Sequence, residues 1–385
     1  MKWTLVASVA CLVLAGTTVV AQSPTISQVF AFYCNDSYSS CPYGMDPTLK
    51  PIQLSNGNFY GVTWWAGQGS SSAGGTVWEV TPAGKASVVH TFEPNKQGEF
   101  PNGENPVIAF AAGADGNLYG ITESGGSANQ GVFYKQPPTD KGFKVELNLC
   151  TGSCTAIQGP VILGNDGNFY GIEDEGGEIF KLTPTGTLST LYTLGSGDGW
   201  AETLLQGSDG NFYGTGVIGT PCDRQATVFK LTPSGQFTIL YTFAAFSEIG
   251  GNLVQASDGN FYGAVENGQT TIFRITPTGS VTMLYSLQQG EGSEVVGLLQ
   301  GSDGNLWGLT ADGGPQPARP GAVFAVSLQG ASIGTAAFNC DTVGCMPMGM
   351  VQGSDGNLYG IAISGGSAPG RVPMGTLFKV NPNGL

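Results

Sequence analysis

Acidic residues recur in this chain at a fixed distance after a repeated phrase. The phrase, Asp/Asn-Gly-Asn followed by Phe/Leu, Tyr/Trp and Gly, begins at residues 56, 115, 166, 209, 258, 303 and 355. The residues eight positions after these starts are, in order, Trp64, Glu123, Asp174, Val217, Glu266, Ala311 and Ile363. Carboxylates can bind a cation or a sugar hydroxyl. We therefore predict Glu123, Asp174 and Glu266 as ligand-binding residues, together with Asp312 after the sixth copy.

Tryptophans are the second kind of candidate, because an indole ring can stack on the face of a sugar ring. Trp64 and Trp65 follow the first copy of the phrase, and Trp200 precedes the fourth. We predict that all three contribute to the same binding face. For each acid and each tryptophan the competing interpretation is structural, as a solvated carboxylate or as an aromatic anchor for a loop.

The residue types give little support to catalysis. The one histidine, His90, falls in a predicted outer strand, so a Ser-His-Asp or Cys-His arrangement is not available, and no phosphate-binding loop is present. The Asp-Gly-Asn phrases lack the alternating oxygens and late carboxylate of a calcium loop, and we interpret them as hairpin turns. We predict no catalytic residue, no metal ligand and no cofactor. A polysaccharide hydrolase or lyase built on two carboxylates is the alternative.

The repeat predicts the architecture that positions these residues. Successive copies start 59, 51, 43, 49, 45 and 52 residues apart, and periods of about 40 to 50 residues with strand patterning are typical of propeller blades. A second phrase, of the form Val-Phe-Lys-Leu-Thr-Pro, alternates apolar and polar side chains as a half-buried strand does. In the copy at Asp258 we expect strands at residues 252–256, 261–265, 271–276 and 281–287, with a two-residue Asp-Gly turn between the first two. The fold class is all-β, a propeller of seven four-stranded blades.

The two ends of the chain predict how the ring closes. The last copy stops at Leu385 after its third strand, and residues 26–32 have the pattern of an unpartnered fourth strand. We expect this N-terminal strand to complete the seventh blade, which removes the open sheet edges. The turns after the first and third strands then share one face, and they are short and uniform. The opposite face carries long, variable loops, and we place binding there.

Seven aromatic residues occupy one equivalent position in the second strand of the blades. A recurrence in every blade favours packing between blades over a ring of sugar-binding aromatics, because a binding site usually interrupts the repeat. The residues are Tyr60, Tyr119, Tyr170, Tyr213, Tyr262, Trp307 and Tyr359.

Residues 1–21 have the features of a signal peptide: Lys2, then an apolar run, then Val19 and Ala21 at a small-residue cleavage site. We expect a secreted protein whose single domain spans residues 22–385. Six of the remaining cysteines form close pairs, and an oxidising compartment favours disulfides over a zinc site. The predicted pairs are Cys34 with Cys41, Cys150 with Cys154 and Cys340 with Cys345, which leaves Cys222 over.

The formal net charge is −14, which disfavours nucleic acid and anionic lipid as partners. After residue 21 no segment has the roughly 20 apolar residues of a membrane span. We expect a monomer whose partner is an extracellular carbohydrate or protein.

The phrases Asp-Gly-Asn-Phe/Leu-Tyr-Gly and Val-Phe-Lys-Leu-Thr-Pro-x-Gly resemble the GloVer-type tandem repeats of exported bacterial proteins over about residues 24–385. That resemblance implies a propeller-like fold and export. Ile275 to Gly279 and Asp303 to Trp307 are also similar, more weakly, to phrases of the virginiamycin B lyase propellers. Those enzymes use histidines and acidic groups around magnesium, and the single His90 does not supply that set.

The sequence thus predicts a secreted, non-catalytic binding module that uses its loop-rich face, with a structural adhesion module as a further alternative. The fold class itself decides none of these.

Overall fold

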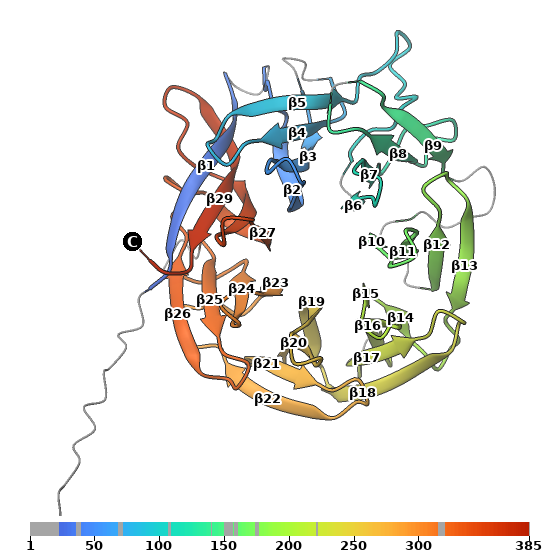
Figure 1. The fold of residues 1–385 in the computed structure, drawn as a ribbon, viewed down its shortest axis with the longest axis vertical. Helices are drawn as coiled ribbons and strands as arrows, with labels where there is room; N and C mark the ends of the chain where they lie inside the picture. Colours follow the sequence, from blue (N-terminus) through green and yellow to red (C-terminus); the bar gives the residue numbers. More distant parts are fainter. Residues whose placement is uncertain are drawn as a thin grey trace, which may run out of the picture.

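A computed structural model describes residues 23–35, 40–67, 72–106, 109–139, 141–149, 157, 161–173, 177–220, 222–314 and 320–384. The described residues form seven antiparallel sheets arranged as a ring around one axis (Figure 1). The predicted all-β, seven-bladed propeller is confirmed. The predicted signal peptide, residues 1–21, lies outside the described residues.

Each blade runs from an innermost strand near the axis to an outermost strand at the rim. Blades 1 and 2 contain β2 (Met45–Gln53), β3 (Phe59–Trp65), β4 (Thr76–Val80), β5 (Ala86–Thr91), β6 (Ala109–Ala112), β7 (Leu118–Ile121), β8 (Val132–Gln136) and β9 (Lys144–Asn148). Blades 3 and 4 contain β10 (Val161–Leu163), β11 (Phe169–Ile172), β12 (Glu178–Leu182), β13 (Leu188–Thr193), β14 (Trp200–Ala201), β15 (Leu205–Gln206), β16 (Phe212–Ile218), β17 (Gln225–Leu231) and β18 (Phe237–Ala245). Blades 5 and 6 contain β19 (Glu248–Gln255), β20 (Phe261–Glu266), β21 (Thr270–Ile275), β22 (Val281–Ser286), β23 (Val295–Gln300), β24 (Leu306–Thr310), β25 (Ala322–Val326) and β26 (Ser332–Ala337).

Blade 7 closes the ring as the chain ends predict. It contains β27 (Cys345–Gln352), β28 (Leu358–Ser364) and β29 (Val372–Asn381), and its outermost strand is the N-terminal β1 (Thr25–Cys34). The register pairs Thr25 with Asn381 and Cys34 with Val372. The two ends of the chain therefore share one sheet, and the blue and red strands lie side by side in Figure 1.

The Asp-Gly phrases form the turns between the first two strands of each blade, with three residues rather than the predicted two. In blade 5 the Ala256 and Asn260 backbones bond across the turn at 2.9 Å, and Gly259 has a φ of 81°. Asp258 Oδ1 accepts from the Asn260 amide at 3.0 Å, and Asp258 Oδ2 accepts from the Tyr262 hydroxyl at 2.8 Å. Glycine alone takes the left-handed conformation here, which is the pattern of a three-residue hairpin loop rather than a two-residue turn. We call this side of the ring the Asp-Gly face.

The repeated aromatics pack between blades, as predicted. Tyr213 of blade 4 lies 4.1 Å from Phe261 of blade 5, measured between ring centroids. Tyr359 of blade 7 lies 4.1 Å from Phe59 of blade 1, so the same contact spans the closure of the ring. Tyr60, Tyr213 and the other members of the set are at most 5% exposed. Each tyrosine therefore buries its ring and keeps its hydroxyl bonded at the Asp-Gly turn.

Glutamines at the end of the innermost strands join neighbouring blades on the Asp-Gly face, a contact that the sequence pattern does not predict. Gln255 Oε1 accepts from the Ser208 amide of the preceding blade at 2.7 Å, and Gln255 Nε2 donates to its own turn at Gly259. Such a side chain satisfies backbone groups of two turns at once. The equivalent glutamines are Gln53, Gln206, Gln300 and Gln352.

The innermost strands, which we call the inner wall, differ around the ring. In blades 5, 6, 7 and 1 they run for 8, 6, 8 and 9 residues, while β6 and β10 run for only 4 and 3. Neighbouring long strands approach each other at glycines. A Cβ on Gly251 would lie 3.0 Å from the Gly297 backbone, and a Cβ on Gly349 would lie 3.0 Å from the Lys50 Cβ. Glycine permits this approach because it has no side chain.

Candidate functional site

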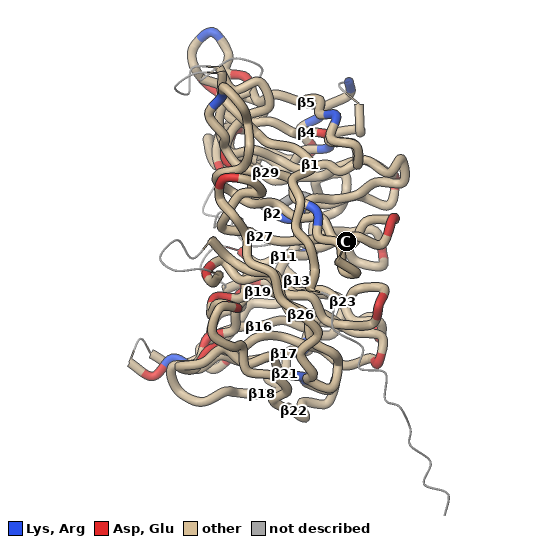
Figure 2. Tube along the Cα trace, turned by 90° about the vertical axis from the view of Figure 1, so that its left-hand side faces the viewer, with Lys and Arg blue, Asp and Glu red and all other residues tan. Residues whose placement is uncertain are grey.

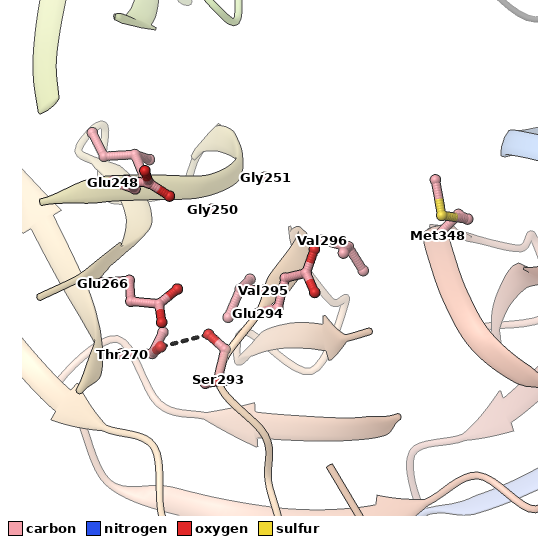
Figure 3. A pocket seen from close by; sticks show the side chains of 11 residues that line it. Glu248, Gly250, Gly251, Glu266, Thr270, Ser293, Glu294, Val295, Val296 and Met348 are labelled. Atoms are coloured by element: carbon pink, nitrogen blue, oxygen red, sulfur yellow. Dashed lines mark hydrogen bonds between the residues drawn. The ribbon is translucent and has the colours of Figure 1, made fainter. Parts of the chain in front are cut away.

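Three glutamates meet on the loop-rich face between blades 5 and 6. Glu248 begins β19, Glu266 ends β20, and Glu294 directly precedes β23. They line a cavity of about 360 Å³, whose far side is bounded by Met348 of blade 7 (Figure 3). The cavity therefore opens where the loop-rich face meets the inner wall.

Two of these glutamates face each other across a strand pair. Glu248 and Glu266 are direct partners in the antiparallel register of β19 and β20. Like charges directly opposite each other in a sheet are destabilising by a few tenths to about 1 kcal/mol. The pair is therefore a local cost to the fold, and the repeat does not require it, because the corresponding partners in blade 1 are Met45 and Trp65.

Asp312 fixes the third glutamate rather than facing the cavity itself. Its Oδ1 accepts from the Ser293 amide at 2.7 Å and from the Glu294 amide at 3.0 Å, and its Oδ2 accepts from the Ser293 hydroxyl at 3.0 Å. The segment before β23 is held further by the Thr270 hydroxyl, which donates to the Ser293 carbonyl (Figure 3). Asp312, predicted as a binding residue, thus acts as a positioning residue for Glu294.

The concentration of negative charge contributes to raised pKa values of two acids in and around the cavity. Burial raises the pKa of Glu266, and the charges of Glu248, Asp312 and Glu294 raise it further. Burial also raises the pKa of Glu202 in blade 4, where Arg224 opposes the shift and Glu248 adds to it. Like charges favour the protonated form of each acid. The site therefore attracts a positive or hydrogen-bond-donating group.

The carboxylates of Glu248, Glu266 and Glu294 accept no hydrogen bond from any residue that the structure describes. They are thus available to sugar hydroxyls, to an ammonium group or to a cation. No group of three or more His, Cys, Asp or Glu side chains within the described ranges is arranged to hold a metal ion. The chemistry that the cavity itself offers is hydrogen-bond acceptance and negative charge.

The predicted tryptophans lie on the loop-rich face and are open to solvent. Trp64 and Trp65 end β3 with exposures of 38% and 42%, and their rings stack at 6.0 Å. Trp200 begins β14 in blade 4 and is 50% exposed. Phe246, which the sequence reading did not select, is 68% exposed in the turn before β19 and has a φ of 63°. A non-glycine residue in that conformation is strained.

The predicted residues do not converge on one site. Glu123 is exposed after β7 in blade 2, and its amide donates to the Asn105 carbonyl. Asp174 lies outside the described residues. Of the six predicted residues that the structure describes, only Glu266 lines the cavity between blades 5 and 6.

The repeated phrase gives no signal for Glu248 and Glu294. Residues that follow the phrase fall at the end of the second strand of a blade, whereas these two residues stand at the start of the first. Glu248 is ten residues before Asp258, and Glu294 is nine residues before Asp303. The antiparallel pairing of the two strands brings both sets of residues to one face.

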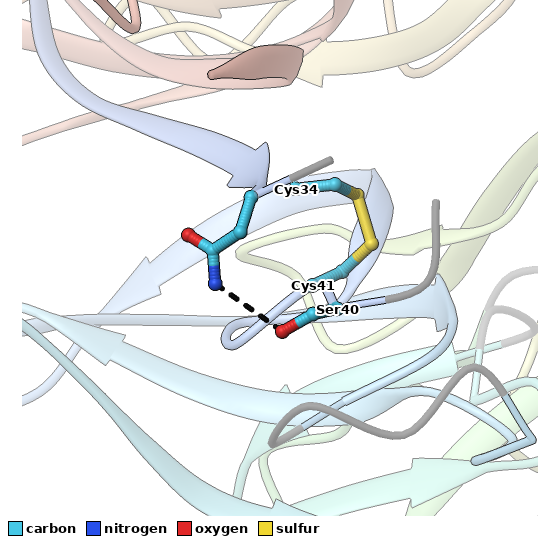
Figure 4. The surroundings of a disulfide bond; sticks show 4 residues. Cys34, Ser40 and Cys41 are labelled. Carbon is cyan, nitrogen blue, oxygen red and sulfur yellow. Dashed lines mark hydrogen bonds between the residues drawn. A yellow bond between two sulfur atoms is a disulfide. The ribbon is translucent and has the colours of Figure 1, made fainter. Parts of the chain in front are cut away.

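One predicted disulfide is present. Cys34 and Cys41 are bonded, with their Cα atoms 4.0 Å apart and both residues fully buried. The bond links the end of β1 to the segment that leads into β2, beside a hydrogen bond from Asn35 to Ser40 (Figure 4). It therefore joins the strand that closes the ring to the first blade.

The other two predicted cysteine pairs are not seen as disulfides in the described residues. Cys340 and Cys345 are thiols in the structure, so the predicted disulfide between them is not formed. Burial and a hydrogen bond with Cys345 raise the pKa of Cys340 to about 12, and Cys345 Sγ lies 3.3 Å from Ser364 Oγ. Cys340 is therefore held as a protonated thiol beside Cys345. Cys150 and Cys154 lie outside the described residues, and Cys222 is an exposed thiol.

His90 has a structural environment in outer strand β5. Its ring stacks on Phe143 at 3.9 Å and contacts Phe92 edge-on at 4.8 Å. Its Nε2 is buried and has no hydrogen-bond partner among the described residues. Burial lowers the pKa of His90 to about 4. The imidazole is therefore neutral at pH 7.

A model of the Gloeobacter/Verrucomicrobia repeat matches residues 25–215 and 201–385 of the chain. No curated protein sequence matches it. Among the described residues, no helix is long and apolar enough to cross a membrane.

Two solved structures illustrate the similarity of the fold. A streptogramin B lyase structure aligns at 15% identity with a TM-score of 0.59, covering 93% of this chain and 98% of that chain. A catalytically inactive variant of virginiamycin B lyase from Staphylococcus aureus, with quinupristin, aligns at 15% identity with a TM-score of 0.60, covering 93% and 99%. At this identity the likeness is one of fold alone.

Proposed function

This chain belongs to the Gloeobacter/Verrucomicrobia repeat family, and on that premise we propose that it is an exported, non-catalytic module that binds an extracellular carbohydrate through its loop-rich face. A surface protein is the second ligand class. The disulfide between Cys34 and Cys41 supports export, because such bonds persist in oxidising compartments.

One observation carries the proposal: the repeated aspartates of the Asp-Gly face are bonded within their turns, whereas two facing glutamates of the loop-rich face are not. On the Asp-Gly face the repeated aspartates accept bonds from their own turns, as Asp258 does from Asn260 and Tyr262. On the loop-rich face Glu248 and Glu266 accept none from the described residues, even though they face each other. Buried or clustered groups that the fold does not use are a mark of functional sites.

Exposed aromatic rings on the same face favour a carbohydrate. Trp64, Trp65 and Trp200 present flat rings to solvent, and carboxylates accept hydrogen bonds from hydroxyl groups. The stacked pair lies in blade 1 and Trp200 in blade 4. An extended chain that crosses the face can contact both, whereas a single sugar unit fits only one of them.

The test is a binding screen of the purified protein against a panel of polysaccharides, with and without calcium, in which released sugar is measured in the same wells. We expect saturable binding without product, weakened at least tenfold by Trp200→Ala or Glu266→Gln. Met283→Ala is the matched control, because Met283 is equally exposed at 50% but lies on outer strand β22.

Two results would redirect the proposal. Product release would support the carboxylate-based hydrolase or lyase, with Glu266 as the acid of raised pKa that such a reaction needs. Absence of both binding and product across the panel would remove carbohydrate as the ligand class and leave a protein partner or a structural adhesion role.

A further inference from the structure

A single lysine of the inner wall stands apart from the other lysines of the repeat. Lys135, Lys181 and Lys230 each form an ion pair with the aspartate of their own blade, at 2.7, 2.8 and 3.4 Å. Lys50 lies instead on β2, the innermost strand of blade 1. Its ammonium has no ion pair or hydrogen bond with any residue that the structure describes.

A bulge in the strand places Lys50 on the inner wall. In the register of β2 and β3, Thr48 pairs with Val62 and the next pair is Ile52 with Tyr60. Three residues of β2, from 49 to 51, therefore stand opposite the single Gly61 of β3. A bulge of this kind takes residues out of the ladder and changes the direction of their side chains, and bulges are frequent beside functional sites.

The neighbouring blade leaves room for this side chain. Gly349 of β27 lies directly beside Lys50, and a Cβ at that position would come within 3.0 Å of the Lys50 Cβ. Lys50 is exposed, and since β2 is the strand nearest the axis, the solvent that reaches it is the solvent along the axis of the ring (Figure 1).

The surroundings of Lys50 supply no negative charge. Although Lys50 is exposed, the surrounding atoms of the inner wall partly desolvate its ammonium and lower its pKa, and no neighbouring carboxylate opposes that effect. The exposed residues on the adjacent strand, β27, are Met346 and Met348, whose side chains are apolar. A charge that is partly removed from water and has no counter-charge is unfavourable. An anion bound at the axis would remove this cost.

We propose that Lys50 is an anion-binding residue that takes the carboxylate or phosphate group of a small ligand entering along the axis of the ring. The ammonium offers up to three donors to such a group, and charge-assisted hydrogen bonds of this type are stronger than neutral ones. The site differs in place and in charge preference from the glutamate cavity, and it does not depend on the proposed carbohydrate function.

The test uses the intact protein with its lysines converted to ¹³C-dimethyl-lysines, whose methyl signals are followed by NMR. Sodium acetate and inorganic phosphate are titrated separately, with sodium chloride as the reference at equal ionic strength. Lys50→Met assigns the Lys50 signal by its disappearance. The signal of Lys85, which is exposed on the turn between β4 and β5 of blade 1, is the control within each sample.

We expect a saturable shift of the Lys50 signal, with half-saturation on the order of millimolar for one charge-assisted contact, while the Lys85 signal follows the chloride reference. A response to acetate alone identifies a carboxylate site, and a response to phosphate alone identifies a phosphate site. If the Lys50 signal moves no more than the Lys85 signal with either anion, the proposal is wrong.

Discussion

The two faces of the ring are built from the same repeat but use their side chains differently. Acidic residues lie on both sides of the ring in the edge-on view (Figure 2). On the Asp-Gly face, aspartate, tyrosine and glutamine are bonded within and between blades. On the loop-rich face, Glu248 and Glu266 oppose each other without bonds, and three tryptophans are exposed. We infer that the repeat stabilises the fold on the Asp-Gly face and leaves the loop-rich face free to vary.

The largest expected effect on the free energy of unfolding distinguishes two residues at opposite ends of β20. Tyr262 and Glu266 both lie on β20, the first fully buried and bonded to Asp258, the second exposed at the loop-rich mouth. We expect Tyr262→Ala to lower the free energy of unfolding by about 3 to 5 kcal/mol, as truncation of a buried aromatic does. Glu266→Ala, its control, removes one of the two facing like charges and is expected to raise it, by up to about 1 kcal/mol. Urea unfolding at pH 7 measures both, and equal losses would abolish the contrast.

The next effect is acid destabilisation through His90. This contribution has to be removed by mutation before the stability of the two faces can be compared at low pH. Its pKa is lowered from 6.5 to about 4 in the folded state, so the unfolded chain binds the proton more readily. Stability is therefore complete above pH 6.5 and falls as the pH drops toward 4, by about 3 kcal/mol.

His90→Phe keeps the stacking on Phe143 and removes the titrating group. We expect the variant to lose most of the stability change between pH 6.5 and 4 in urea unfolding. A variant with the same pH profile as the unmodified protein would show that other groups cause the acid sensitivity.

The disulfide between Cys34 and Cys41 is the exception on the loop-rich face, because it serves stability there. It closes a short loop next to the strand that completes blade 7. We expect replacement of both cysteines by serine to cost about 2 to 3 kcal/mol through the entropy of the unfolded chain. The measurement is thermal unfolding with and without reductant: reductant should lower the midpoint of the unmodified protein and leave that of the variant in place.

The smallest expected effect has the opposite sign. Glu248→Gln removes one of two like charges that face each other, and we expect it to raise the free energy of unfolding by up to about 1 kcal/mol at pH 7. Because the pKa of Glu266 is raised in the fold, the repulsion is present above that pKa and disappears as the pH falls below it. The gain should therefore shrink by pH 4.

Glu123→Gln, an exposed acid of blade 2, is the matched control for Glu248→Gln and should leave stability unchanged at both pH values. A loss of stability in Glu248→Gln would mean that its carboxylate stabilises the fold. The proposed difference between the two faces would then be wrong for Glu248.

Much of the fold was predictable because the repeat encodes it locally. The Asp-Gly turn, the aromatic after it and the alternating second strand follow from residues close in sequence, as in Asp258, Gly259 and Tyr262. The closure by β1 was also predictable, since the last blade ends one strand short. The join made by Gln255 was not, because its partner Ser208 is 47 residues away and glutamine at a strand end has no fixed role.

The candidate site was predictable only in part. The spacing from the phrase identifies Glu266, but it also selects Glu123, which belongs to another blade, and Asp174, which lies outside the described residues. It assigns to Asp312 a binding role where the structure shows a positioning one. Equivalent positions of different blades lie apart around the ring, so a shared distance from the phrase does not bring them to one site.

The sequence by itself determined the number of blades, their strand pattern and the way the ring closes, because these depend on hydrophobic alternation and turn chemistry repeated along the chain. Only the tertiary structure decided which charges meet. Glu248 and Glu266 come from two strands of blade 5 and Glu294 from the residue before β23 of blade 6, and Lys50 lies in a bulge of β2 beside Gly349. Such encounters depend on the register between strands and on the packing of one blade against the next, which no local pattern records.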